Sequence, residues 1–243
     1  MKRVVVILTV LLPLALGSCT KGNNEHVSLS ASDITLFYNE QHQIEASSNG
    51  QITYFSENEF HATVSNTGLV KARHVGETNI KLNNGVSSDN FRVVVKPRYN
   101  VYTEPDVQFG ESKSSIKAKF GTPLSDTSEG IIYADYSNNA PFLMFLFDNS
   151  NRMTEYAVMV NQSQSTALAN FLAERYLYIG ESDGIFAYVN GLNPNTASMG
   201  VGRGLFETYW MVVYTQITTG TRSLSISEQS KFHILFNQII NNK

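Results

Sequence analysis

The sequence predicts two domains, an all-β sandwich at residues 27–97 followed by an α+β domain at residues 98–243. Short β-rich or alternating runs, separated by turn residues and without helical periodicity, fill the first of these segments. In the second segment the patterns follow in the order helix, meander, helix, meander. That order is typical of helices packed on one face of an antiparallel sheet.

The first 18 residues have the three-part layout of an export signal. Basic residues precede an apolar run from Val4 to Leu16, which is shorter than the about 20 residues of a membrane-spanning helix. Cys19, the only cysteine, follows Leu16-Gly17-Ser18, where lipid-transfer enzymes require a thiol. We therefore predict a cleaved signal peptide at residues 1–18, acylation of Cys19 and a lipidated tether at residues 19–26. The alternative is a buried free thiol at Cys19.

The charge of the mature chain limits its partners. Loss of Lys2 and Arg3 lowers the count of basic residues from 18 to 16, against 21 acidic residues, so the formal charge falls from −3 to −5. Such a chain lacks the basic surface that binds nucleic acid. We expect attachment to a membrane through acyl chains such as palmitate, at the outer membrane or cell surface of a Gram-negative cell. Because Cys19 is the only cysteine, its acylation would leave no free thiol for a disulfide, a thiolate metal site or a cysteine nucleophile.

Turns such as Asn49-Gly50 and Asn66-Thr67-Gly68 divide the first domain into strands. About seventy residues suffice for one small sandwich core. We predict strands at residues 27–30, 34–38, 43–46, 52–55, 62–64, 69–72, 78–82 and 91–95.

Three of these segments carry a family resemblance. Ile34-Thr35-Leu36, the run from Ala62 to Ala72 and the run from Val75 to Ile80 resemble the group 2 bacterial immunoglobulin-like domain. The sequence departs from the family pattern at Glu57–Phe60, where a serine and aspartate turn is more common, and Tyr54 or Phe55 stands where tryptophan is frequent. The resemblance implies an immunoglobulin-like sandwich, a surface module found in adhesins and carbohydrate-active envelope proteins, and it brings no catalytic residues.

The second domain follows Pro97 and an extended connector at residues 98–105. A helix is predicted from Ser112 to Phe120, with Ser112 or its neighbour as N-cap and Gly121 at its end. Further helices are predicted at residues 165–174 and, as an amphipathic closing helix, 227–241. Strands are predicted at residues 131–136, 142–147, 153–160, 176–179, 184–189, 196–201 and 206–217.

The segment from Phe109 to Pro123, with the meander after it, resembles a C-terminal module of surface lipoproteins of Gram-negative gut bacteria. That resemblance implies a cell-adhesion protein. The helix-plus-meander order is also similar in topology to β-lactamase-inhibitory-protein-like folds.

Three short motifs resemble chemical sites, but their contexts favour ordinary turns. Gly180–Gly184 matches the G-x-S-x-G pattern of serine hydrolases, yet a β-type run follows it where a helix is required, so we expect a hairpin turn. Gly200–Gly204 resembles a phosphate-binding loop, but a strand follows, so we expect a hairpin or bulge. Asp148–Asn151 lacks the glycine and glutamate of a calcium loop and is expected to be a turn.

No metal or cofactor is expected. The five histidines lack the spacings of zinc sites. Asp135 and Glu155 could be neighbours across strands, as in the paired carboxylates of a glycosidase, although acidic residues are ordinary on the solvent face of a sheet.

Aromatic residues are the remaining candidates for binding, because they stack on sugar faces and anchor protein interfaces. Along residues 206–217, Trp210 and Tyr214 fall on one face and Tyr209 on the other, so at least one set belongs to the core. The candidate ligand-binding residues are Tyr176, Tyr178, Tyr188, Tyr209, Trp210 and Tyr214.

These observations predict a non-catalytic adhesion or ligand-binding protein of the cell envelope. The second domain would recognise a glycan or an envelope protein, with the first as a spacer. One alternative is an envelope enzyme acting on glycans, which a deep cleft with two carboxylates would favour. The other is an inhibitor or assembly factor for another envelope protein, which a flat aromatic patch would favour.

Overall fold

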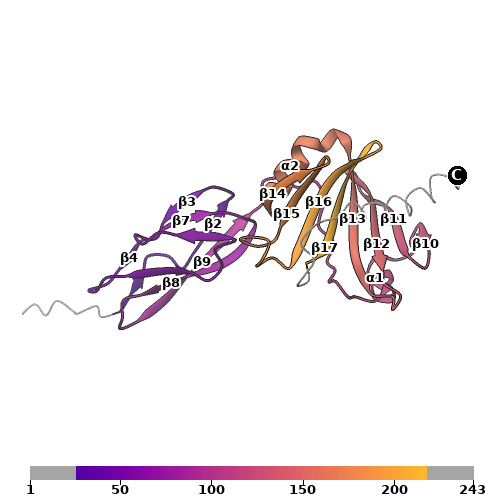
Figure 1. Ribbon diagram of the computed structural model, residues 1–243. Coiled ribbons are helices and arrows are strands. Elements are labelled where there is room, and N and C mark those ends of the chain that lie inside the picture. Colours follow the sequence, from indigo (N-terminus) through magenta and orange to yellow (C-terminus); the bar gives the residue numbers. More distant parts are fainter. Residues whose placement is uncertain (1–25, 218–243) are drawn as a thin grey trace, which may run out of the picture.

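The computed structural model describes residues 26–217 (Figure 1). The predictions for the signal peptide, Cys19, the tether up to residue 25 and the helix at residues 227–241 therefore lie outside the described residues. Within residues 26–217 the strands form two groups of sheets, and each group has its own hydrophobic clusters. None of the helices in this range is both long and apolar enough to cross a membrane.

The first group, called here the N-terminal sandwich, spans residues 28–96. It has a four-stranded sheet of order β2-β9-β8-β5, a three-stranded sheet of order β3-β7-β6 and the short pair β1-β4. β2 runs parallel to β9. The bounds are β1 Ser28–Leu29, β2 Asp33–Phe37, β3 Gln41–Gln43, β4 Ala46–Ser47, β5 Thr53–Ser56, β6 Ala62–Val64, β7 Leu69–Ala72, β8 Gly76–Asn83 and β9 Ser88–Lys96.

The core of the N-terminal sandwich lies between its sheets. Val70 of β7 is buried in one cluster with Ile80 of β8 and Phe91 of β9. Side chains alternate between the two faces of a strand, so each sheet turns its apolar residues inward. The single strand predicted at residues 43–46 is instead two strands, because the chain leaves β7, the partner of β3, and pairs with β1 as β4.

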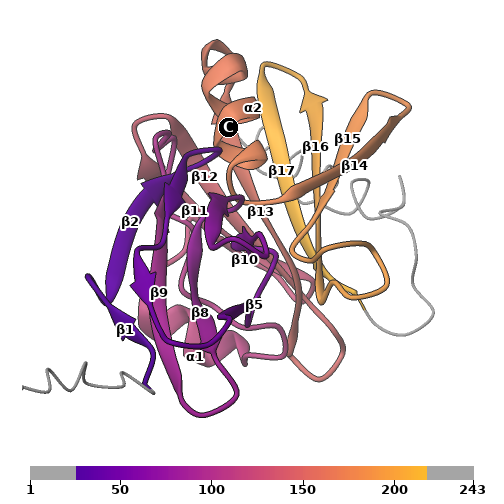
Figure 2. The same ribbon diagram turned by 90° about the vertical axis from the view of Figure 1, so that its left-hand side faces the viewer.

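The second group is one antiparallel sheet of eight strands, with the order β10-β11-β12-β13-β17-β16-β15-β14 (Figure 1). Figure 2 shows the part of it from β17 to β14. The predicted meander is present as β11, β12 and β13. The bounds are β10 Ser125–Asp126, β11 Gly130–Ser137, β12 Ala140–Phe147, β13 Met153–Asn161, β14 Leu177–Ser182, β15 Ile185–Val189, β16 Met199–Phe206 and β17 Tyr209–Gln216.

Two helices pack on one face of this sheet. They are α1 (Lys113–Phe120) and α2 (Ser165–Ala173), the latter preceded by the 3-10 turn η1 (Gln162–Gln164). Ile116 of α1 and Phe171 of α2 share a buried cluster with strand residues such as Val212, so this face is called the helix face. Ser112 is the N-cap of α1, and its hydroxyl accepts a hydrogen bond from the Ser115 N–H at 3.1 Å. Both helices thus lie where the sequence predicts them.

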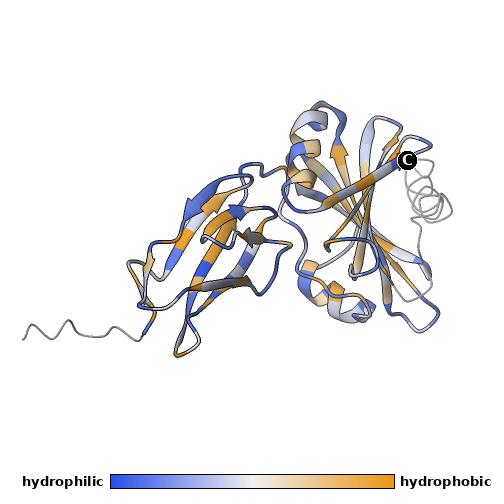
Figure 3. Cartoon of the chain, turned by 60° about the vertical axis from the view of Figure 1, so that its left-hand side comes forward, coloured by the Kyte–Doolittle hydropathy of each residue, from blue (hydrophilic) through white to orange (hydrophobic). Residues whose placement is uncertain are grey.

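The opposite face of the sheet is apolar as well. Met144, Ala157, Met159, Met211 and Val213 form a separate buried cluster there, and the central strands are largely hydrophobic along their length (Figure 3). The predicted alternation along β17 is confirmed, with Trp210 and Tyr214 packed on the helix face and Tyr209 on the opposite face.

The hairpin or bulge predicted at Gly200–Gly204 is wrong. This segment is the middle of β16, and its register with β17 is unbroken from Met199 opposite Gln216 to Phe206 opposite Tyr209. The glycines alternate with Val201, Arg203 and Leu205, so the strand still presents side chains on one face. The turn comes later, at Glu207, whose φ is 50°.

Candidate functional site

The six aromatic candidates are distributed over four places. Tyr176 and Tyr214 are buried beside the connector. Tyr178, half-exposed, lies edge to face with Tyr188, with ring centroids 5.4 Å apart. Trp210 lies on the helix face over a buried arginine, and Tyr209 contacts Phe142 on the opposite face, with centroids 6.0 Å apart. They do not form one row.

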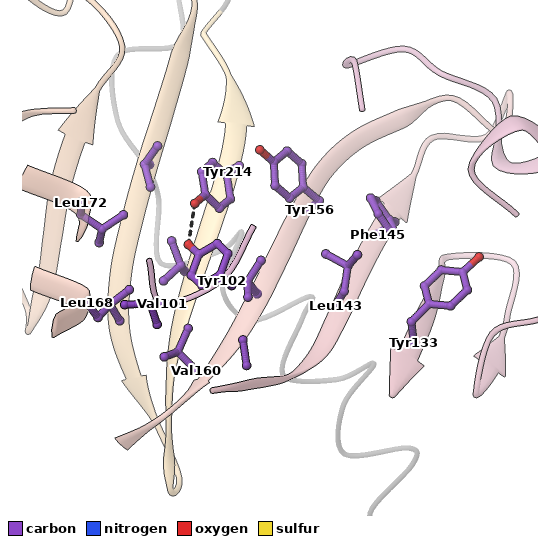
Figure 4. Close-up of a cluster of buried hydrophobic side chains, with 14 of the residues drawn as sticks. Val101, Tyr102, Tyr133, Leu143, Phe145, Tyr156, Val160, Leu168, Leu172 and Tyr214 are labelled. Atoms are coloured by element: carbon purple, nitrogen blue, oxygen red, sulfur yellow. Dashed lines mark hydrogen bonds between the residues drawn. The ribbon is translucent and has the colours of Figure 1, made fainter. Parts of the chain in front are cut away.

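The buried tyrosines hold a carboxylate of the connector. Tyr102 and Tyr214 share a hydrogen bond of 2.6 Å between their hydroxyls (Figure 4). The Tyr214 hydroxyl also contacts Oε1 of Glu104 at 3.0 Å, and the Tyr176 hydroxyl donates to the same oxygen. Burial raises the pKa of all three tyrosines well above the ordinary value. They therefore stay protonated near neutral pH, and Glu104 is held as an acceptor.

A second buried carboxylate ties the two groups of sheets together. Glu174, at the end of α2, is 2% exposed. Its carboxylate accepts hydrogen bonds from the backbone N–H of Arg98 at 3.0 Å and of Tyr99 at 2.9 Å, and from Arg175 Nη1 at 2.8 Å. Its backbone carbonyl accepts from the Val75 N–H of the sandwich at 2.7 Å. The connector therefore begins at a fixed point on α2.

A cleft of about 450 Å³ is lined in part by Glu104 and by Arg175, the neighbour of Glu174, and we call it the junction cleft. Clefts of this size suit small ligands. Both groups of sheets contribute to its walls. The lining residues are Asn58, Phe60, His61 and Val75 from the N-terminal sandwich, and Glu104, Arg175, Tyr176, Asn190, Gly191, Leu192 and Thr196 from the C-terminal part.

The loop between β15 and β16 forms one rim of the junction cleft. Asn190 shapes this loop, because its Oδ1 accepts from the N–H groups of Ser198 at 3.0 Å and Met199 at 2.8 Å. Gly191 is required for the tight packing there, since a Cβ at this position would lie 2.9 Å from the Ala197 Cα. Leu192, 43% exposed, projects from the rim.

Two charged residues, Glu104 and Arg175, line the cleft beside groups that can form hydrogen bonds. Arg175 Nε lies 3.7 Å from Glu104 Oε2, and the Arg175 guanidinium also lies over the Phe171 ring at 3.7 Å. Among the lining residues, all within residues 26–217, Glu104 is the one carboxylate. The cleft thus offers amide, hydroxyl and ion-paired groups beside aromatic rings, and it lacks the two acidic residues that a glycosidase would place there.

The other motifs resolve as turns. The hairpin turn predicted at Gly180–Gly184 is present but shorter, because residues 180–182 pair with β15 as the end of β14. The turn is Asp183-Gly184, with both residues in the left-handed region at φ values of 54° and 77°. Asp148 Oδ1 accepts from the N–H groups of Ser150 and Arg152 at 2.8 and 2.9 Å, so this segment is also the predicted turn.

Asp135 and Glu155 are not a catalytic pair. Glu155 lies opposite Leu146 of β12, whereas Asp135 follows Ala134, which lies opposite Phe142. Four residues along a strand correspond to about 13 Å. No group of three or more histidine, cysteine, aspartate or glutamate side chains in the described range could hold a metal ion.

Comparison with known proteins identifies the first group of sheets. Residues 31–95 match the model of the Bacterial Ig-like domain (group 2) family, which confirms the family resemblance of this segment. A search of curated proteins found no match.

Three solved structures are similar only at low TM-scores. An intimin mutant of EHEC O157:H7 is 15% identical, with 74% of this chain and 86% of that chain covered and a TM-score of 0.24. Domains 4–9 of the surface layer protein SbsC are 11% identical, with 80% and 27% covered and a TM-score of 0.26. SbsC domains 5–6 are 11% identical, with 80% and 85% covered and a TM-score of 0.25. At these TM-scores the likeness carries no argument.

Proposed function

We propose that this chain, with its immunoglobulin-like module at residues 31–95, is a non-catalytic protein of the bacterial cell surface that binds a glycan in the junction cleft. The observation that carries this proposal is the cleft itself, whose walls come from both groups of sheets. A neutral sugar presents hydroxyl groups and apolar ring faces, and the lining supplies amide and carboxylate groups beside aromatic rings.

The proposal gives the N-terminal sandwich a direct part in recognition. Its residues Asn58, Phe60 and His61 line the cleft, so it acts as one wall of the site as well as a spacer. Cleavage after residue 18 and acylation of Cys19 would place the sandwich next to the membrane and hold the cleft above it. The residues from 98 onward would form the recognition domain.

A glycan-binding screen tests this function. The chain produced from residue 20 onward would be applied to neutral envelope and host glycans, with Leu192→Arg as the blocking variant, because this exposed side chain lines the cleft. Leu124→Arg is the matched control, since Leu124 is 49% exposed and does not line the cleft. We expect binding that Leu192→Arg abolishes and Leu124→Arg preserves. Hydrolysis of a bound glycan, or equal binding by both variants, would contradict the proposal.

A further inference from the structure

The helix face of the eight-stranded sheet contains an arginine held between aromatic rings. Arg203 of β16 is 6% exposed. Its Cζ lies 4.5 Å from the ring centroid of Phe186 on β15 and 4.2 Å from that of Trp210 on β17. Neighbouring strands thus supply a ring on either side, and cation–π attraction orients the planar guanidinium.

Two hydrogen-bond donors of this cluster have no partner among the described residues. Arg203 Nε and Trp210 Nε1 are both buried without a hydrogen-bond partner from residues 26–217. Within residues 26–217 no carboxylate forms an ion pair with Arg203. Glu181, exposed on β14, acts on it only through longer-range charge. Buried donors are nearly always paired in proteins, so two adjacent unpaired donors indicate a site built for an acceptor from outside.

The surroundings of Arg203 are apolar and reachable. Tyr178 is 50% exposed and Leu205 is 52% exposed. Leu205 is two residues from Arg203 on the same strand and therefore lies on the same face. Phe186 and Trp210 are themselves only partly buried. A ligand would therefore meet a surface of rings and aliphatic carbon, with the guanidinium directly beneath it.

We propose that Arg203, Phe186, Trp210 and Tyr178 form a binding site for a saccharide that carries a carboxylate. A guanidinium and a carboxylate match as a two-pronged pair, and the indole N–H can donate a further hydrogen bond. The exposed rings suit the apolar face of a sugar, which an acidic peptide lacks. This site is separate from the junction cleft. Met199 adjoins the loop that lines the cleft, and Arg203 lies four residues farther along β16, which corresponds to about 13 Å. The proposal for Arg203 therefore does not depend on the function proposed for the cleft.

The experiment uses the only tryptophan of the chain as a local reporter. Oligogalacturonate would be titrated into the chain from residue 20 onward while the Trp210 fluorescence is recorded. We expect a saturable change that weakens at least about tenfold with the methyl-esterified oligomer, which has lost its charge. Arg203→Met should cause a similar loss, because methionine fills the space between the rings without a charge.

Two further variants control the result. Arg203→Lys keeps the charge but loses the planar fork, so it should also bind more weakly. Arg152→Met removes an exposed arginine just before β13 and should bind as the wild type does.

Three results would each overturn the proposal: equal affinity for the esterified oligomer, no binding by fluorescence and calorimetry, or wild-type affinity in Arg203→Met. Equal or tighter binding of hexaglutamate would assign the site to an acidic peptide instead. Leu192→Arg, which blocks the cleft, should leave this titration unchanged, so the two proposals fail separately.

Discussion

Acidification should destabilise the N-terminal sandwich through His74. This side chain is 6% exposed, and its ring stacks on Phe60 with centroids 4.4 Å apart. Its Nδ1 is buried, and no described residue forms a hydrogen bond with it. Burial, with smaller contributions from the charges of Arg73 and His61, lowers the pKa of His74 to about 4, although a hydrogen bond with the Ala173 backbone opposes this shift.

The sign and size of the effect follow from this pKa. An unfolded histidine has a pKa of about 6.5, so between pH 6.5 and pH 4 the unfolded chain binds a proton that the folded chain does not. The stability is therefore complete above pH 6.5 and is lost as the pH falls toward 4. One pH unit corresponds to about 1.4 kcal/mol, which gives a loss of about 3 kcal/mol over this range.

The assay is urea unfolding followed by far-UV circular dichroism at several pH values from 7.5 to 4.5. In His74→Phe, a phenyl ring can stack on Phe60 and binds no proton, so the variant should lose about 3 kcal/mol less than the wild type on acidification. His42→Phe is the control for replacing an imidazole, because His42 also stacks on a phenylalanine ring, at 5.7 Å from Phe91. An unchanged pH dependence in His74→Phe would refute the reasoning.

Three other substitutions test the junction and the anchor. Glu174→Ala removes the acceptor of two connector N–H groups and should lower the free energy of unfolding by about 3 kcal/mol. Limited proteolysis should cut the connector faster in this variant than in the control Glu129→Ala. Equal cleavage rates would argue against a fixed junction. Tyr214→Phe removes a hydroxyl bonded to Tyr102 and Glu104 and should lower the free energy of unfolding by about 1 to 3 kcal/mol, whereas an unchanged melting temperature would mean that this network contributes nothing. Cys19→Ser should abolish metabolic labelling with a palmitate analogue and release the protein from the membrane fraction; retained labelling would exclude Cys19 as the acylated residue.

Local patterns in the sequence were enough to predict most elements of the fold. The strands at residues 62–64 and 69–72 have the predicted bounds, because alternation between clear turn signals leaves little choice of register. The prediction of a hairpin or bulge at Gly200–Gly204 was wrong, since glycine usually marks a turn. In β16 the strand is held by two neighbouring strands, and that tertiary support outweighs the weak preference of glycine for extended structure.

The junction cleft could not be predicted in the same way. Its lining residues run from Asn58 to Thr196, and nothing in their local sequence marks them as neighbours. The predicted aromatic set included Trp210 and Tyr178, but Arg203 appeared only as part of a glycine-rich motif. Its role depends on the register of β15, β16 and β17, which brings rings to both sides of it.

If the proposed acylation of Cys19 anchors the protein at a membrane, the shared construction of the cleft has a mechanical consequence. Tension between a held ligand and the membrane would load the hydrogen bonds at Glu174, which join the two groups of sheets side by side. Once these yield, the two walls of the cleft separate, because Phe60 and Leu192 belong to different groups of sheets. Rupture of the junction and release of the ligand would then be a single event, with a force threshold to which the buried Glu174 contributes through both its carboxylate and its backbone carbonyl.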